Sequence, residues 1–430
     1  MTANILRNPF VYGRAVSGEE FVNRDKEIRT ICDRLGHSES TLVLGQPHIG
    51  RSSLLLQIAS KEPLRRFMGD DADRFYIFWK DVLAMPCDYA PAEFWREALE
   101  ALIRCQDSQI LHLIERARQE NYSHLSLEQL FKALGEKGMC MVMLLDEFEV
   151  LLGHPNFQRD FFGSLRSMAS ITRGLAMVVS SRLSIAELNE KGRQMLETGS
   201  PYFNIMIDLP LLPLEEEGVE KLLDRAGDRF SPEDRRFIRR VAGRHPYLLQ
   251  AMAACLFESE GVDRYVRSAE TFYQRVSHHF HDLWKSMDGP TRTAAVILCL
   301  VELGGRALGG RFDYGEIARV DIFERELQNL EALGLAERVA TGWQFDWRHA
   351  LLWQGERWAV GTQAFCWWVR DMIIAQHRQI PAWEEWLSRK QYLWFITQEQ
   401  WDSWVRIIKR ALPWLPLIKS LLDDIGVKVI

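Results

Sequence analysis

The feature that most constrains this chain is a short loop bounded by two glycines. It reads Gly45, Gln46, Pro47, His48, Ile49, Gly50, Arg51, Ser52, Ser53. An apolar, β-branched run at residues 41–44 precedes the loop, and an apolar run at 54–58 follows it. In a strand–loop–helix of this kind, backbone N–H groups and the helix N-terminus point at one anion. The loop therefore predicts a phosphate-binding site.

The pattern GxxxxGK[ST] is met here at every fixed position except one. Arg51 stands where the pattern has lysine, and Ser52 stands where it has the hydroxyl that binds Mg²⁺. We expect Arg51 to bind phosphate with its charge. A guanidinium is larger and more fixed in direction than an ammonium, so we expect any turnover to be slow.

Two further apolar runs end in side chains that suit a nucleotide site. Residues 139–145 end in Asp146 and Glu147, and residues 175–179 are followed closely by Arg182. A carboxylate at such a position holds Mg²⁺ through water, and a second one orients the attacking water. We assign these roles to Asp146 and Glu147, respectively. Arg182 is placed to detect a γ-phosphate.

Strand-like and helix-like runs alternate through the first half of the chain, which predicts an α/β fold with helices on both faces of a parallel sheet. The expected strands are 41–44, 75–79, 139–145, 175–179 and 204–209. A long helical stretch is expected at 91–134. Open sheets of this class bind ligands at the carboxyl ends of their strands, where all three motifs fall.

Several segments together resemble one protein family. They are 8–13 (NPFVYG), 21–28 (FVNRDKEI), the phosphate loop, Asp146-Glu147, Ser181-Arg182 and 243–248 (GRHPYL). With these residues the chain resembles the STAND class of P-loop ATPases, in the branch near archaeal ATPases and the AAA+ superfamily. The resemblance extends over about residues 4–350. The loop is the Walker A motif of that class, and Asp146-Glu147 is its Walker B motif.

The resemblance implies ATP or ADP with Mg²⁺ as ligands. In the family, the N-terminal segment and a proline flank the adenine, which places Phe10, Tyr12, Asn23, Arg24 and Pro246 beside the base. Asn23 stands where the family usually has glycine.

The resemblance also implies a division into domains. We expect an N-terminal segment over the adenine (1–40), a P-loop NTPase core (41–210), a helical lid (211–285), a winged helix (286–355) and a tryptophan-rich helical C-terminal region (356–430). A strong helix start at 231–234 supports the lid. The wing is expected as strands 336–339 and 343–345 around a turn at 340–342.

The expected winged helix is poorly suited to DNA. Its third helix, 322–333, carries Glu324, Glu326 and Glu331 against Arg325, and the whole chain has a net charge of −6. Such a helix repels phosphates. We therefore expect an arm that packs on the ATPase core. His349, just past the wing, is a candidate for the ADP phosphate because the family has a histidine near there.

The C-terminal region 356–430 holds nine of the 15 tryptophans. They fit a small aromatic core or a docking surface about equally well, because tryptophan is enriched at both. A membrane-interface role is a weaker third alternative.

Composition limits the cellular setting. Apolar residues make up 47% and charged residues 26% of the chain, as in soluble globular proteins. Seven scattered cysteines without paired spacing indicate reduced thiols. No apolar stretch is long enough for a membrane span, and no signal peptide is visible. We expect a cytoplasmic protein.

The leading hypothesis is an ATP-controlled switch with slow ATPase activity that self-associates. In the family, such switches serve signalling, often in prokaryotic antiviral defence. Since no sensor repeat is visible, we expect a separate sensor or effector protein. One alternative is a DNA-associated AAA+ regulator of the origin-recognition or transposition type. The other is a nucleotide-binding scaffold without turnover.

Overall fold

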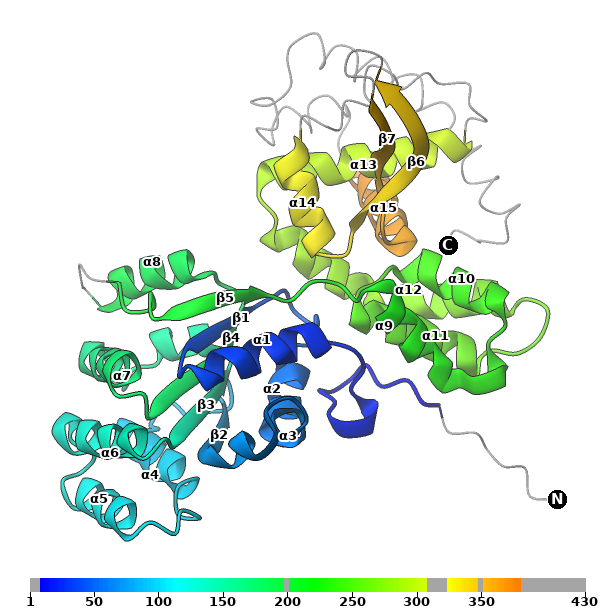
Figure 1. Ribbon diagram of the computed structural model, residues 1–430. Coiled ribbons are helices and arrows are strands. Elements are labelled where there is room, and N and C mark those ends of the chain that lie inside the picture. The colour runs from blue at the N-terminus through cyan, green and yellow to red at the C-terminus, as the bar shows by residue number, and fades with distance from the viewer. Residues whose placement is uncertain (1–7, 197–200, 308–322, 347–350, 380–430) are drawn as a thin grey trace. The chain divides into compact units, whose positions relative to one another are not determined.

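A computed structural model describes residues 8–196, 201–307, 323–346 and 351–379 (Figure 1). The chain divides into two compact units. We call Gly13–Leu212 the sheet unit. We call Met1–Tyr12 together with Pro213–Ile430 the helical unit. None of the helices in the described part of the chain is both long and apolar enough to cross a membrane.

The sheet unit is built on five parallel strands in the order β2-β3-β4-β1-β5 (Figure 1). Their bounds are β1 Ser40–Leu44, β2 Phe75–Asp81, β3 Cys140–Asp146, β4 Leu175–Ser181 and β5 Met206–Pro210. All five predicted strands are confirmed, with ends shifted by one or two residues. Every residue of β3 and β4 is buried, which explains why these strands are continuous apolar runs.

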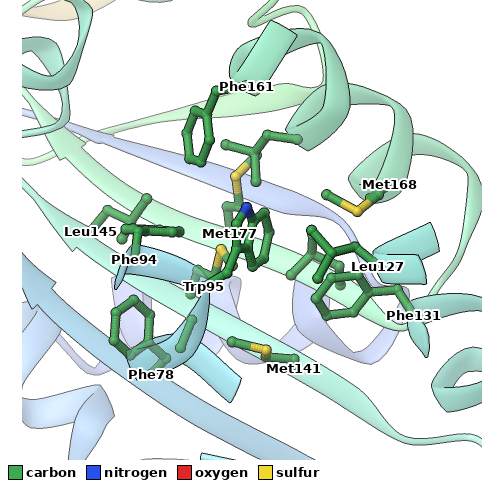
Figure 2. Packing of buried hydrophobic residues seen from close by; sticks show 14 of the residues in the cluster. Phe78, Phe94, Trp95, Leu127, Phe131, Met141, Leu145, Phe161, Met168 and Met177 are labelled. Atoms are coloured by element: carbon green, nitrogen blue, oxygen red, sulfur yellow. The ribbon is translucent and has the colours of Figure 1, made fainter. Parts of the chain in front are cut away.

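Helices cover both faces of this sheet, as expected. On one face lie α1 Asp25–Gly36, α2 Arg51–Ala59 and α3 Glu62–Met68. On the other lie α4 Pro91–Glu100, α5 Ser108–Gln119, α6 His124–Glu136, α7 Arg159–Ile171 and α8 Ile185–Leu196. Figure 2 shows the second face, where Met141 and Met177 of the sheet pack under the rings of Phe94, Trp95 and Phe131.

The helical stretch expected at 91–134 is present, but it is divided into three helices. The Asp107 carboxylate caps α5 by accepting the N–H groups of Gln109 and Ile110 at 3.0 and 3.1 Å. The Ser123 hydroxyl caps α6 by accepting the N–H of Ser126. Each cap satisfies N–H groups that a continuous helix would not expose.

Two glycines let α6 cross closely over the backbone that leads into β4. A Cβ on Gly174 would overlap the carbonyl oxygen of Phe131 and lie 2.9 Å from the nitrogen of Gly135. A Cβ on Gly135 would overlap the carbonyl oxygen of Thr172. Since these neighbours are backbone atoms, they cannot move aside as a flexible side chain would.

We therefore expect Gly174→Ala to lower the free energy of unfolding by about 3 kcal/mol, the upper end of the usual cost of overpacking. Urea unfolding followed by circular dichroism measures this change. The matched control is Gly163→Ala in α7, where the new Cβ would meet only the Tyr202 ring, at 3.8 Å. Equal stability of the two variants would contradict the close crossing.

The helical unit begins with four helices in the segment expected as a lid: α9 Glu216–Leu223, α10 Pro232–Ala242, α11 Pro246–Glu258 and α12 Arg264–Ser286. The predicted helix start is confirmed. The Ser231 hydroxyl accepts the N–H of Asp234, and the Asp234 carboxylate accepts the N–H of Ser231 at 2.8 Å.

The next elements are α13 Gly289–Ala307, α14 Glu324–Ala332, β6 Ala336–Asp346, β7 Leu351–Val360 and α15 Gln363–Gln379. The predicted turn at 340–342 is wrong: β6 continues through it and pairs antiparallel with β7. The register shifts between Ala340 and Gly342, so the glycine is accommodated as an irregularity within the strand. His349, the candidate for the ADP phosphate, lies outside the described residues.

The hairpin β6–β7 is joined to the lid segment by polar contacts. Arg239 of α10 bridges Glu216 of α9 and Glu337 of β6, both at 2.7 Å. The Thr362 hydroxyl lies 2.8 Å from the carbonyl oxygen of Gly334 and 3.3 Å from that of Ala242.

Helix α15, which follows the hairpin, packs against α10, α12 and α13. It buries Phe365, Cys366 and Val369. The boundary expected between residues 355 and 356 falls inside β7. Helices α9–α12, the hairpin and α15 are therefore parts of one compact unit.

Candidate functional site

The phosphate loop starts at the end of β1 in a tight curl. The Gly45 N–H donates to the Ser181 carbonyl oxygen at 3.2 Å, which ties the loop to β4. A Cβ on Gly45 would lie 2.7 Å from Cγ2 of Ile49. His48 and Gly50 both have positive φ, at 64° and 104°. The curl thus needs glycine at position 45 for close approach and at position 50 for backbone conformation.

Helix α2 begins at Arg51, immediately after the loop, and its first bond runs from the Leu54 N–H to the Gly50 carbonyl oxygen at 3.0 Å. The N–H groups of Arg51, Ser52 and Ser53 precede that bond and have no acceptor within the helix. With the helix dipole they form an anion-binding end. The Ser53 hydroxyl accepts the Val16 N–H at 3.1 Å, so it anchors the N-terminal segment.

Arg51 lies inside the site, with 5% of its surface exposed. Its Nη2 donates to Oε1 of Glu147 at 2.7 Å. Its Nη1 is buried and has no hydrogen-bond partner among the described residues. A buried guanidinium N–H without a partner is costly, so Arg51 has donor capacity for a further oxygen ligand.

Glu147 is shared between two arginines. Its Oε2 accepts from Nη2 and Nε of Arg182 at 3.2 and 3.4 Å, while Oε1 pairs with Arg51. Only 17% of the Glu147 side chain is exposed. The structure thus brings together three predicted residues from the start of α2 and the ends of β3 and β4, with one carboxylate between two guanidinium groups.

Asp146 is oriented by Ser180, for which the sequence predicted no role. The Ser180 hydroxyl, from the end of the neighbouring strand β4, donates to Oδ1 of Asp146. The Glu147 N–H lies 3.2 Å from that Oδ1 and 3.0 Å from the Ser180 oxygen. Glu147 has a φ of 53°, which turns its side chain away from the strand direction. The sequence feature that could have indicated this role is a small polar residue directly after the apolar run 175–179.

Glu149 is the second residue that was missed. It lies in the 3₁₀ turn Phe148–Gly153 with 8% of its surface exposed, and its Oε1 accepts the backbone N–H of Arg182 at 3.2 Å. Nε of Arg182 lies 3.5 Å from the same oxygen. Four charged residues thus alternate in sign: Arg51, Glu147, Arg182 and Glu149.

Arg24 supports the phosphate loop. Only 6% of its surface is exposed, and its Nη2 donates to the carbonyl oxygen of Ile49 at 3.4 Å while Nη1 pairs with Glu27 at 2.9 Å. Asn23 and Arg24 both have positive φ, at 67° and 75°, and α1 begins only at Asp25. The N-cap of this helix is therefore Arg24, and Asn23 lies outside it. Two successive strained residues turn the Arg24 side chain inward.

The other residues expected at the adenine belong to the helical unit. The Phe10 ring stacks on Phe230 at 5.6 Å and is 5% exposed. The Tyr12 hydroxyl accepts from Nη1 of Arg275 at 2.9 Å. Pro246 is the first residue of α11. Contact of Phe10, Tyr12 or Pro246 with adenine stays a prediction.

The residues assigned to Mg²⁺ are one hydroxyl, Ser52, and one buried carboxylate, Asp146. No cluster of three or more His, Cys, Asp or Glu side chains suited to a metal occurs in the described ranges. A nucleotide-bound Mg²⁺ takes most of its ligands from phosphates and water, so a hydroxyl and a carboxylate of this kind fit it.

One family model matches part of the chain. Residues 108–301 match the model of the AAA-like domain family. The matched stretch contains Asp146, Glu147 and Arg182 but begins after the phosphate loop. No match was found among curated proteins.

Solved structures are similar over most of the chain, but at low identity. The Walker-type ATPase of Pyrococcus abyssi is 13% identical with a TM-score of 0.48, covering 84% of this chain and 99% of that one. The ORC2 protein of Aeropyrum pernix in its ADPNP–ADP complexes is 14% identical with a TM-score of 0.46, covering 86% and 98%. The ORC1 protein of the same organism in complex with DNA is 14% identical with a TM-score of 0.36, covering 83% and 94%.

The parallel sheet and the curled loop between β1 and α2 give the sheet unit the architecture of a P-loop NTPase, and residues 108–301 are similar to AAA-like domains.

Proposed function

We propose that the sheet unit binds ATP and ADP at the phosphate loop and acts as a nucleotide-controlled switch. The observation that carries this proposal is the carboxylate of Glu147 held between Arg51 and Arg182. A phosphate group offers the same kind of charged oxygens to a guanidinium as a carboxylate does. The Glu147 carboxylate therefore occupies the position between the two arginines that a phosphate group would take.

Nucleotide phosphates would compete with Glu147 for Arg51. The loop N–H groups and the N-terminal end of α2 would bind the phosphates. The guanidinium of Arg51 would then donate its hydrogen bonds to a phosphate oxygen and no longer to Glu147. Glu147 is then free to accept a proton from water near the γ-phosphate. Mg²⁺, held by Ser52 and near Asp146, would supply charge stabilisation for the phosphates. This exchange of partners is the proposed switch.

Slow hydrolysis is part of this proposal. Glu147 must leave two arginines before it can orient water, and Arg51 is bulkier than the lysine usual at its position. A nucleotide-binding scaffold without turnover is the limiting case, in which Glu147 never leaves Arg182.

The finer biological role that we propose is STAND-type signalling with self-association and a separate sensor or effector protein. It rests on the motif order in the sequence. DNA binding through α14 is disfavoured, because this helix carries Glu324, Glu326 and Glu331 against the single Arg325.

The test is calorimetric titration of the full chain with ATP and with ADP in the presence of Mg²⁺, followed by light scattering. We expect both nucleotides to bind and only ATP to increase the scattering mass. Absence of binding by either nucleotide would refute the proposal. Salt-sensitive binding of duplex DNA, tested in parallel, would instead favour a DNA-associated regulator.

A further inference from the structure

Glu149 is a buried carboxylate whose side-chain contacts are to Arg182. Its Oε1 accepts the Arg182 backbone N–H at 3.2 Å and lies 3.5 Å from Nε of the same arginine. Its Oε2 is buried without a hydrogen-bond partner in the described part of the chain. Its own carbonyl oxygen accepts from Nζ of Lys191 at 2.9 Å, which fixes the turn against α8.

This arrangement lowers the stability of the fold, and holding Arg182 in place is a function that explains it. Burying a carboxylate with one oxygen unsatisfied costs stability, whereas a neutral side chain would avoid that cost. The Arg182 side chain is 51% exposed and long, so without an anchor it would sample many rotamers. Glu149 accepts the backbone N–H of Arg182 and lies 3.5 Å from its Nε, which restricts the guanidinium to the end of β4.

The second anchor of Arg182 is Glu147, whose Oε2 lies 3.2 Å from Nη2 and 3.4 Å from Nε. In the proposed function Glu147 exchanges its partners when phosphates enter. Glu149 is then the carboxylate that continues to hold Arg182, because it contacts the Nε side and leaves the terminal Nη2 for a γ-phosphate oxygen.

We propose that Glu149 is a positioning residue that fixes Arg182 for the γ-phosphate and so sets the preference for ATP over ADP. This inference rests on the proposed function. ADP lacks the phosphate that Arg182 would contact, so removal of Glu149 should weaken ATP binding and leave ADP binding unchanged.

The experiment measures affinities for a non-hydrolysable ATP analogue and for ADP in the full chain carrying Glu149→Gln. We expect the ATP-to-ADP preference to fall about tenfold, the scale of one lost charge-assisted hydrogen bond. Arg182→Ala should produce a fall at least as large. Glu149→Gln should add nothing in that background, because the two residues act as one unit.

Two further variants exclude a general effect on folding. Glu190→Gln removes another glutamate–arginine pair of the sheet unit, with Arg193 at 2.9 Å on exposed α8, and should leave both affinities unchanged. Arg182→Lys keeps a positive charge but lacks Nε. It should lower the preference for ATP over ADP, as Glu149→Gln does.

The outcomes separate the two proposals. If Arg182→Ala lowers the preference but Glu149→Gln does not, Glu149 has no positioning role. Equal losses for ATP and ADP in Glu149→Gln would likewise overturn the inference, because they indicate a structural role. A wild-type chain that binds neither nucleotide would overturn the proposed function, and this inference would fall with it.

Discussion

Replacement of Arg51 by alanine is expected to weaken binding of both ATP and ADP by roughly 10- to 150-fold. This corresponds to the loss of a hydrogen bond to a charged group, about 1.5–3 kcal/mol. Arg51 is 5% exposed, and its Nη1 has no partner within the described residues, so its donors suit a phosphate. Calorimetry with each nucleotide measures the effect.

Two controls make this result specific. Arg65→Ala removes an arginine of the same unit whose ion pair with Asp73 is exposed, and it should not change the affinities. Arg51→Lys restores a charge at the position and should retain binding without lowering the ATPase rate. Nucleotide affinity that is unchanged in Arg51→Ala would show that the loop does not bind phosphate through this side chain.

The sheet could be predicted from sequence because its physical signal is local. Strands buried on both faces must be apolar throughout, and β3 and β4 fit that rule over seven residues each. Because parallel strands have their carboxyl ends at one edge of the sheet, the sequence predicts that Glu147 and Arg182 lie near each other.

The contacts within the site could not be predicted in the same way. Whether Glu147 faces water or Arg51 depends on its φ of 53°, which no composition rule gives for a glutamate. Glu149 reads as one more acid after a Walker B motif. Its burial follows from the 3₁₀ turn that carries it under Arg182, a tertiary effect.

The helical unit shows the same limit at a larger scale. The tryptophan-rich sequence after residue 356 fits a core and a docking surface equally, because both present aromatic side chains on one helix face. The structure resolves part of this choice: Trp367 of α15 is buried, and the ring of Trp368 lies 5.7 Å from that of Trp284 within the helical unit. The alternatives stay open for residues 380–430, which lie outside the described ranges.

Replacement of Glu147 by glutamine should have the opposite effect to Arg51→Ala. It removes the charge that competes with phosphate for Arg51 and Arg182 while keeping the shape of the side chain. We expect tighter binding of ATP, by about tenfold, which is the scale of one charge-assisted bond that nucleotide no longer has to replace. The rate of ATP hydrolysis, measured as released phosphate, should fall because an amide cannot accept the proton of water.

The same substitution should destabilise the protein without nucleotide, since Arg51 would be left buried beside a neutral group. Its melting temperature should therefore fall in the free state and rise more than that of the wild type when ATP is added. Glu97→Gln is the matched control: it changes the net charge equally and breaks a half-buried pair with Lys80 at 2.6 Å. Weaker ATP binding in Glu147→Gln, with Glu97→Gln unchanged, would mean that Glu147 assists nucleotide binding and does not compete with it.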